Sequence, residues 1–559
     1  MLSRTAAPAG WWAPHPAQRP ATPLATGEDA LRRALHRLSE PVSVVDVTSA
    51  AVTSAAVGAE LGVGVGGQAL LGGEAFQGSW PMRAWVAPCR PDQLGDPRFR
   101  ADHGLRYAYV TGAMANGIGS ADIVEAMSRA GMLGFFGAAG LSLERVEANI
   151  RRIQANLGVL PYGVNLIHSP NEMSLEMAVA DLLMRYEVRL VEASAYLGLT
   201  LPIVKYRVAG IHRGADGAVV TPNRIVAKVS RVEVASKFFA PPPERMLREL
   251  VEMGHITPEQ AVLAESVPMA QDITAEADSG GHTDNRPAIT LLPTLIALRD
   301  QMQARYGFAQ ALRVGAAGGI ATPASVAAAF AMGAAYVVTG SINQACQESG
   351  SSDPVREMLA KAGQADVIMA PAADMFEMGV KVQVLKRGTM FAMRGAKLYE
   401  VYRAYKSIEE IPADVKAQLE REIFRQPMEA IWDSTAAFFQ QRDPEQLHRA
   451  AADPHHKMAL VFRWYLGLAS RWANAGEASR AMDYQVWCGP AMGAFNEWVR
   501  GSFLEHRQER RVVTVALNLL VGAAVSMRVQ SLRQQGVALS PAVAQVTPMD
   551  LEELQQCLA

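Results

Sequence analysis

The stretch that decides the fold is DITAEADSGGHTDN, residues 272 to 285. It predicts a short strand that runs into a glycine turn carrying Gly280, Gly281 and His282. Paired glycines let a backbone approach a ligand closely, because no Cβ is in the way. A histidine at such a turn can hold or donate a proton near neutral pH, which makes His282 the candidate catalytic residue. The alternative is an ordinary strand-to-helix loop, and the stretch alone does not separate the two.

Residues 272 to 276 form the sixth of eight predicted strands that alternate with helices. The other strands are expected at residues 107–111, 132–136, 162–167, 188–193, 225–229, 312–316 and 335–339. Regular strand–helix alternation is typical of a parallel α/β fold. Eight such units in a run of about 230 residues match a TIM (β/α)8 barrel, a closed ring of parallel strands surrounded by helices.

The barrel is expected to occupy residues 101–345 of the 559-residue chain, with a hairpin insertion at residues 203–225. Ahead of it, residues 1–30 are rich in Pro and Ala and are predicted to be mobile, and residues 31–100 to form a small β-containing module. Behind the barrel the alternation is lost. We expect a helical substrate or lid subdomain at 346–510, a returning helix at 511–535 and a tail at 536–559.

The composition indicates a soluble, cytoplasmic protein with no nucleic-acid or membrane partner. Lys and Arg total 53 against 55 Asp and Glu, so no basic character points to nucleic acid. The four cysteines form no CxxC motif, which argues against a disulfide framework or structural zinc, and we expect no metal site. The N-terminus lacks the apolar core of a signal peptide. The apolar run Val512–Met527 is interrupted by Asn518 and is short for a bilayer.

Two glycine-containing loops follow the last two predicted strands. The first holds Gly318 and Gly319 ahead of a helix that starts at Thr322-Pro323, and the second is Thr339-Gly340-Ser341. TIM-barrel enzymes bind phosphate with the loops after strands seven and eight, helped by a helix N-terminus. One phosphate site without a GxGxxG motif favours a mononucleotide such as FMN over a dinucleotide held by a Rossmann fold. The alternative is a pair of tight structural loops.

Three further strand ends carry candidate cofactor-binding residues. Gly112, Ala113 and Met114 follow the first strand, where small residues would let a flat ring rest on the backbone. Asn165 ends the third strand and Lys228 the fifth, and both could hydrogen-bond a flavin. A cationic Lys228 near the ring would favour the anionic reduced flavin. The alternatives are that Asn165 caps a turn and that Lys228 is a solvated strand end.

Together these segments resemble the FMN-dependent enoyl reductases of the nitronate monooxygenase (2-nitropropane dioxygenase) superfamily. The resemblance is to the PfaD-type, trans-acting enoyl reductases of polyunsaturated fatty acid and trans-AT polyketide synthases, over roughly residues 35 to 530. The segments that carry it are Val110–Ala115, Tyr162–Leu166, Val191–Tyr196, Ala227–Arg231, Glu276–Asp284, Gly315–Ile320, Val338–Ser341 and Phe376–Phe391. The whole ordered set of segments is specific for the PfaD type, whereas the glycine–histidine turn alone indicates only the superfamily.

The resemblance implies an FMN-binding barrel capped by a helical substrate subdomain, in a protein that forms a homodimer. FMN would pass hydride from NADPH to the β-carbon of a 2,3-enoyl thioester held on an acyl carrier protein. His282 occupies the position of the superfamily's active-site histidine, so we expect it to orient the thioester carbonyl or to protonate the α-carbon. Direct protonation by solvent is the alternative. Asp284 is a candidate to orient His282, and Glu276 is a candidate buried structural group.

The roles of two further segments are undecided from the sequence, and two alternative functions are possible for the whole protein. The basic segment 381–406 suits an acidic carrier protein or the NADPH phosphates, or it is a solvated helix face. The Met and Phe residues between Met369 and Met393 line an acyl tunnel or, as methionines more often do, fill a core. The alternative functions are a nitronate monooxygenase-like flavin oxidase and a non-catalytic docking barrel.

Overall fold

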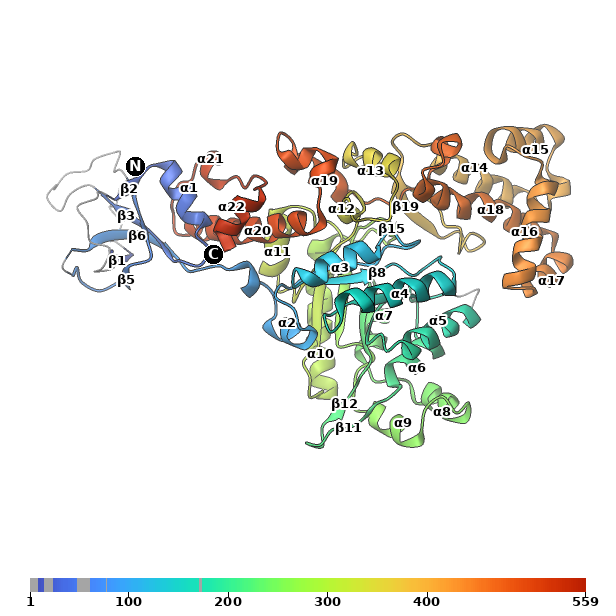
Figure 1. Cartoon of the computed structure of the whole chain (residues 1–559), viewed down its shortest axis with the longest axis horizontal. Helices are drawn as coiled ribbons and strands as arrows, with labels where there is room; N and C mark the ends of the chain where they lie inside the picture. Colours follow the sequence, from blue (N-terminus) through green and yellow to red (C-terminus); the bar gives the residue numbers. More distant parts are fainter. Residues whose placement is uncertain (1–8, 15–23, 48–60, 77, 170–172, 559) are drawn as a thin grey trace.

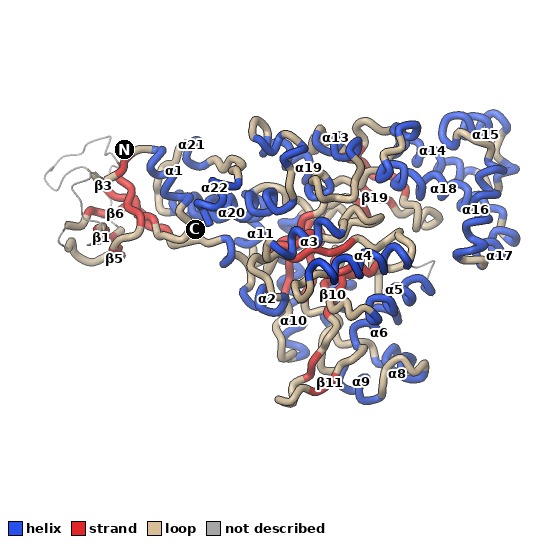
Figure 2. The backbone as a smooth tube through the Cα atoms, viewed as in Figure 1, coloured by secondary structure: helices blue, strands red, loops and turns tan. Residues whose placement is uncertain are grey.

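The computed structural model of the protein describes residues 9–14, 24–47, 61–76, 78–169 and 173–558. At its centre, parallel strands close into a barrel in the order β10-β13-β14-β16-β17-β7-β8-β9, red in Figure 2. These strands are β7 (Tyr109–Thr111), β8 (Leu133–Phe136), β9 (Gly163–Ile167), β10 (Leu190–Ser194), β13 (Arg224–Val229), β14 (Asp272–Glu276), β16 (Arg313–Ala317) and β17 (Val337–Thr339). All eight expected strands are present, and the predicted TIM barrel is confirmed.

Helices between the strands cover the outside of the barrel (Figure 1). The side chains of Ser120 and Thr322 accept hydrogen bonds from the first turns of their helices, and the helix start predicted at Thr322-Pro323 is confirmed. The helices are α3 (Ala121–Arg129), α4 (Leu143–Leu157), α5 (Met173–Arg185), α6 (Leu201–Val208), α7 (Val232–Phe239), α8 (Glu244–Glu252), α9 (Pro258–Ala264), α10 (Ala288–Tyr306) and α11 (Pro323–Ala331).

The hairpin insertion is shorter than predicted. Only β11 (His212–Arg213) and β12 (Val219–Val220) pair, and residues 201 to 208 form the helix α6. Pro202 stands in the first turn of α6, where its missing N–H removes no hydrogen bond. Because α6 is buried on all sides, its sequence lacks the 3.6-residue alternation that marks a helix with a polar face.

The N-terminal module is an antiparallel sheet in the order β2-β4-β3-β6-β1-β5, at the left of Figure 1. Its strands are β1 (Gly10–Ala13), β2 (Ala25–Thr26), β3 (Val42–Asp46), β4 (Leu61–Val65), β5 (Gln68–Leu71) and β6 (Trp80–Val86). The prediction that residues 1–30 are mobile is wrong for β1, which pairs with β5 and β6. The buried Trp12 anchors β1, since its indole N–H donates to the Gly66 carbonyl at 2.7 Å. Residues 1–8 and 15–23 lie outside the described part of the chain.

The C-terminal helices join the N-terminal module to the barrel. α20 (Val512–Gln534) packs on α11 and β6, and α1 (Glu28–His36), α21 (Pro541–Ala544) and α22 (Leu551–Leu558) complete a shared apolar core. The residues predicted as a tail therefore belong to this core. The Asn518 side chain is buried in it and hydrogen-bonds both backbone groups of Met549.

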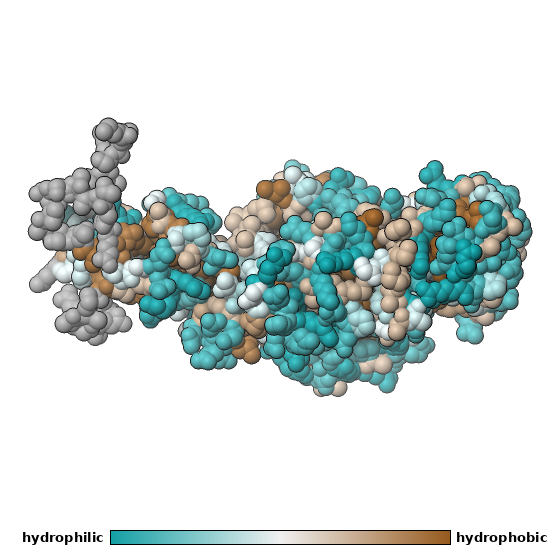
Figure 3. All heavy atoms as spheres, turned by 90° about the horizontal axis from the view of Figure 1, so that it is seen from above, coloured by the Kyte–Doolittle hydropathy of each residue, from teal (hydrophilic) through white to brown (hydrophobic). Residues whose placement is uncertain are grey.

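α20 confirms the returning helix predicted at residues 511–535. Among the described residues it is the one helix long and apolar enough to cross a membrane, yet 78% of its most apolar stretch is buried inside the protein. Its apolar character thus matches a core helix. The outer faces of the barrel and cap seen in Figure 3 are mainly polar.

A cap follows the eighth barrel strand. Its helices are α12 (Ser341–Gln344), α13 (Asp353–Ala360), α14 (Phe391–Ala404), α15 (Ala413–Leu419), α16 (Met428–Arg442), α17 (Glu445–Ala452), α18 (Pro454–Ala475) and α19 (Ala491–Val499). The prediction of a purely helical subdomain at 346–510 is wrong in one respect, because β18 (Val367–Pro371) and β19 (Lys381–Leu385) form a small sheet. The third strand of this sheet, β15 (Gly281–His282), comes from the sixth barrel loop. The histidine turn is therefore held by the cap as well as by the barrel.

Candidate active site

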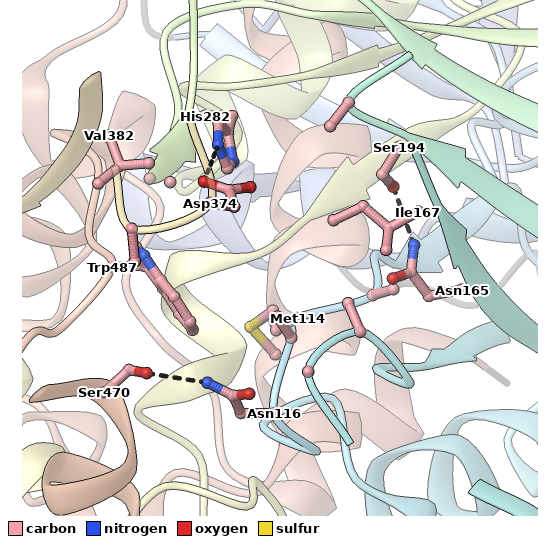
Figure 4. A pocket seen from close by; sticks show the side chains of 18 of the residues that line it. Met114, Asn116, Asn165, Ile167, Ser194, His282, Asp374, Val382, Ser470 and Trp487 are labelled. Carbon is pink, nitrogen blue, oxygen red and sulfur yellow. Dashed lines mark hydrogen bonds and ion pairs between the residues drawn. The ribbon is translucent and has the colours of Figure 1, made fainter. Parts of the chain in front are cut away.

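The carboxyl ends of the barrel strands and the cap enclose a cavity of about 640 Å³ (Figure 4). Every candidate site residue from the sequence lines this cavity: Gly112, Ala113, Met114, Asn165, Lys228, Gly280, Gly281, His282, Gly318, Gly319, Thr339, Gly340 and Ser341. The closed barrel thus brings segments from across the whole barrel sequence around one space. Their location agrees with the predicted site, and their roles stay predictions.

The glycine loops after β16 and β17 leave open space beside their backbones. A Cβ built at Gly319 or Gly340 would meet no atom within 4 Å, and the φ of Gly319 is 74°, which favours glycine. Gly318 is tightly packed, since its Cβ would lie 2.5 Å from the carbonyl carbon of Ala277. Both loops lead directly into helices, α11 and α12, whose first N–H groups attract anions. This open cradle has the chemistry and the room that a phosphate needs.

Two side chains fix the second of these loops in place. The Thr339 hydroxyl donates to the Tyr109 hydroxyl at 2.9 Å, on the neighbouring strand β7. The Ser341 hydroxyl accepts from the backbone N–H of Gly489 at 3.1 Å, in the cap. The loop is therefore tied to the barrel and the cap together.

The loop after β7 forms a flat wall of the cavity. The N–H of Ala113 donates to the Glu192 carboxylate at 2.8 Å, below the loop. The loop after β8 packs directly on it, because a Cβ at Gly137 would lie 1.7 Å from the Met114 carbonyl oxygen. At the other end, the Asn116 amide donates to the Ser470 hydroxyl of α18 at 3.0 Å (Figure 4). These contacts hold the backbone in one conformation against the cap.

Lys228 is not a solvated strand end, because its side chain is largely buried between two carboxylates. Its ammonium lies 3.6 Å from Glu192 and 3.4 Å from Glu276. Burial lowers the pKa of Lys228, but the two carboxylates outweigh burial and raise the pKa above its usual value. Burial raises the pKa of Glu192, against the opposing effects of Lys228 and the Ala113 N–H. Lys228 is thus charged, but its charge is offset by two acids.

Asn165 does not cap a turn. It lies within β9, is buried, and its amide N–H group donates to the Glu192 carbonyl at 3.1 Å and to the Ser194 hydroxyl at 3.0 Å (Figure 4). Both acceptors belong to the neighbouring strand β10. The side chain is therefore fixed by the barrel at the edge of the cavity.

His282 pairs with an acid that the sequence analysis did not nominate. Its Nε2 lies 3.2 Å from the Asp374 carboxylate, which follows β18 in the cap (Figure 4). Burial lowers the pKa of His282, but the hydrogen bond to Asp374 and the nearby carboxylate charges outweigh burial and raise the pKa. The prediction that Asp284 orients His282 is wrong. The Asp284 carboxylate instead accepts from the Ser230 hydroxyl at 2.6 Å and pairs with Arg231 at 2.8 Å.

The apolar roof of the cavity comes from α16 and α18. It includes Phe438, Phe439, Leu460, Trp464 and Leu468. Among the described residues, the lining includes none of the methionines between Met369 and Met393, while Phe376 and Phe391 are fully buried in the cap core. That segment does not line the cavity, so the acyl-tunnel interpretation of it is wrong. The core interpretation holds for Met375, which is buried, but not for Met378 and Met393, which are exposed.

The basic segment 381–406 is distributed over β19 and α14, and several of its charges are already paired. Arg394 forms an ion pair with the buried Asp483, and Arg387 lies 3.4 Å from Asp366. Lys397 lies 3.9 Å from Glu400 on the same helix. Part of the positive charge of this segment is therefore already neutralised.

Sequence reasoning missed Glu192, Asp374 and the roof residues. Glu192 had a local signal, because a lone acid within the apolar strand β10 predicts a buried, functional charge. Asp374 had no such local signal, since 92 residues separate it from His282. The roof residues occupy ordinary helices whose facing surface is set by cap packing.

Two family models match the chain. The first, described as nitronate monooxygenase, matches residues 102–426, more than half of the chain. The chain belongs to the nitronate monooxygenase family. The second, described as the inserted helical domain of acyl-carrier-protein S-malonyltransferase, matches residues 405–484. This second match extends beyond the first one and covers the cap helices α16, α17 and α18.

Relatives with high identity occur in two kinds of synthase. A polyunsaturated fatty acid synthase subunit of Thraustochytrium sp. is 50% identical over 455 residues, which cover 80% of this chain and 30% of the relative. Polyketide biosynthesis protein PksE of Bacillus subtilis is 46% identical over 446 residues, which cover 79% of this chain and 58% of the relative. The chain thus spans less than two thirds of the length of either relative.

One solved structure is matched over almost its whole length. The enoyl reductase domain of MlnA, from the macrolactin biosynthesis cluster of Bacillus amyloliquefaciens, is 39% identical, with a TM-score of 0.75. The match covers 79% of this chain and 99% of that domain. The two proteins therefore share the barrel together with its cap.

Proposed function

We propose that the protein reduces the 2,3 double bond of enoyl thioesters on an acyl carrier protein, with NADPH as the reductant and FMN as the bound cofactor. The observation that carries this proposal is the cavity, where an open glycine cradle, a flat backbone wall and the His282 imidazole face one space. The MlnA domain, an enoyl reductase by name, and the fatty acid and polyketide synthase relatives support the same activity.

The residues present fit FMN. Gly319 and Gly340 leave room for its phosphate beside two helix starts, and Gly112 to Met114 would support its ring. Asn165 and Lys228 would bind the polar edge of the ring. When bound, FMN supplies hydride transfer between NADPH and the substrate.

The contribution of the chain itself is a proton for the α-carbon of the thioester. His282 has a raised pKa and so keeps its proton at a higher pH than an ordinary histidine. Asp374 engages Nε2, which leaves Nδ1 as the nitrogen that donates to substrate. The pairing of β15 with β19 holds the backbone of His282 while it does so.

A carrier-borne substrate is supported by the cap. Residues 405–484, which include α16 and α18, match a helical domain that the family description assigns to a transferase acting on acyl carrier protein. In this chain those helices line the cavity with Phe438, Phe439 and Trp464. An apolar roof of this kind suits an acyl chain, because burial of each CH₂ group contributes about 0.8 kcal/mol.

The test is to load the purified protein with FMN and supply NADPH with a crotonyl thioester of pantetheine or carrier protein. We expect a yellow protein that oxidises NADPH and releases the saturated thioester, identified by mass spectrometry. Protein that takes up no FMN, or that oxidises no NADPH with enoyl thioesters, contradicts the proposal. Oxygen-dependent consumption of a nitronate without enoyl reduction would support the flavin oxidase alternative.

A further inference from the structure

Three arginines from three separate elements gather at the rim of the cavity. Arg442 ends α16 and Arg471 lies on α18, and both line the cavity. Arg145 lies in the first turn of α4, directly after the loop whose residues 138–141 also line it. The three side chains are exposed, so a ligand entering the cavity from solvent can reach them.

The charges of Arg442 and Arg145 both act on Arg471. Burial lowers the pKa of Arg471, and the positive charges of Arg442 and Arg145 lower this pKa further. Within the described residues, neither Arg145 nor Arg471 forms an ion pair with a carboxylate. By contrast, Arg463 on the same helix as Arg471 lies 3.3 Å from Glu377. Like charges held together at a cavity mouth favour binding of an anion.

This rim is separate from the glycine cradle. The loops with Gly319 and Gly340 follow β16 and β17, whereas Arg145 follows β8, on the other side of β7 in the barrel. Arg442 and Arg471 belong to the cap helices α16 and α18, so the rim and the cradle are built from different elements.

The rim is also separated from His282. Arg471 directly follows Ser470, whose hydroxyl accepts from Asn116. Figure 4 shows the Asn116–Ser470 pair on one side of the pocket and His282 with Asp374 on the other, with Met114 and Trp487 between them. A ligand that reaches from Arg471, the chain neighbour of Ser470, to His282 must therefore be extended, with its anionic group at one end and its reacting group at the other.

We propose that Arg145, Arg442 and Arg471 bind the phosphate of the phosphopantetheine arm that carries the substrate, while the thioester at the other end of the arm reaches His282. This inference rests on the proposed function. A phosphate suits the site because guanidinium groups donate paired hydrogen bonds to phosphate oxygens. A pantetheine arm has the required form, since it places one phosphate and one thioester at opposite ends of an extended chain.

The test compares crotonyl-4′-phosphopantetheine with crotonyl-pantetheine, which lacks the phosphate. In the wild-type protein we expect the KM for the phosphorylated substrate to be lower by about tenfold or more, the effect of a charge-assisted hydrogen bond. Arg471→Gln and Arg145→Gln should each raise that KM several-fold. The KM values for the phosphorylated and unphosphorylated substrates should therefore become more similar. The control is Arg245→Gln, on an exposed turn of α8 remote from the cavity, which should change neither value.

A binding measurement separates this inference from the proposed function. Isothermal titration of the FMN-loaded protein with 4′-phosphopantetheine, which carries no acyl group, should give tighter binding than pantetheine, and Arg471→Gln should remove the difference. Equal binding of the two compounds overturns the inference even if enoyl reduction occurs. If no enoyl thioester is reduced, the proposed function fails, and the titration alone decides whether the rim binds phosphate.

Two kinetic outcomes would also overturn the inference. If Arg471→Gln raises the KM for NADPH but not for NADH or the phosphorylated thioester, the phosphate at the rim belongs to the dinucleotide. If Arg471→Gln raises the KM for both thioesters equally, Arg471 supports the structure of the cap and does not bind the phosphate.

Discussion

At the scale of single residues, the proposed chemistry depends on the pair formed by His282 and Asp374. The carboxylate comes from the cap and the imidazole from a barrel loop, so the pair exists only when the cap is docked. The pKa of Asp374 is lowered by its bond to His282 in spite of its burial. Both pKa shifts favour an imidazolium beside a carboxylate over a neutral pair, as a proton-donating role for His282 would require.

Replacing His282 by Ala should remove the proton donor while leaving the cofactor cradle intact. We expect the His282→Ala protein to bind FMN, seen from its visible absorbance, and to lose about 10²–10⁴-fold in kcat, the usual contribution of a general acid. Full activity in this variant would assign protonation to solvent.

The raised pKa of His282 makes a pH dependence testable. If the protonated ring donates the proton, kcat/KM falls as the pH rises through that pKa, above the ordinary value of 6.5. Asp374→Asn removes the hydrogen-bonded charge that raises the pKa, so this alkaline limb should move to lower pH. A pH–rate profile of both proteins checks the shift. If the alkaline limb of the pH–rate profile stays at the same pH in Asp374→Asn, the titration of His282 does not control catalysis.

At the scale of elements, glycine loops and helix starts form the cradle. Gly319 combines a positive φ with open space at its Cβ position, so the backbone there can lie against a ligand. The reciprocal hydrogen bonds between Thr322 and Ser325 fix the start of α11 just behind the loop. The loop conformation and the helix start together determine where an anion can bind.

Gly319→Asp should abolish FMN binding. The carboxylate would occupy the space left for the phosphate and would repel it. Gly319→Ala is the matched control, because it introduces the same backbone strain without the charge, and it should bind FMN more weakly than the wild type but measurably. Fluorescence titration of the apoprotein with FMN compares the three. Tight binding by Gly319→Asp would place the phosphate elsewhere.

At the scale of the whole molecule, the barrel is closed at the end opposite the cavity by a buried ion cluster. Arg313 pairs with Asp272 at 2.6 Å, and His103 bonds the same carboxylate at 2.9 Å. Burial raises the pKa of Asp272, but the bond from His103 and the charge of Arg313 outweigh burial and hold the pKa at about 2. The cluster joins β14 and β16 to α2 (Pro97–His103), ahead of the first barrel strand.

Arg313→Leu should destabilise the protein strongly, because it leaves the Asp272 charge buried with only His103 beside it in this cluster. The expected loss is about 3–5 kcal/mol, measured by denaturant unfolding of the barrel. The exposed pair of Arg98 with Asp96 is the matched control, and Arg98→Leu should cost about 1 kcal/mol or less. Equal effects would show that the cluster adds no stability beyond a surface ion pair.

Much of the fold and part of the site were predictable from local patterns. The strands, the caps at Ser120 and Thr322, and the cavity-lining glycines follow from periodicity and from backbone chemistry within a few residues. The helix α6 was not predicted, because burial on all its faces removes the periodicity of apolar residues. The strand β1 was not predicted, because the Pro- and Ala-rich composition of the segment gave no indication that Trp12 is buried and anchors it.

The sequence by itself determined the barrel, the order of its loops and the position of His282 at one of them, because each depends on neighbouring residues. Only the tertiary structure decided that Asp374, 92 residues away, holds His282, and that Lys228 lies between two carboxylates. Those contacts join side chains that meet only when the barrel closes and the cap adds its strand to the histidine turn. Their energies depend on burial, which no local stretch of sequence specifies.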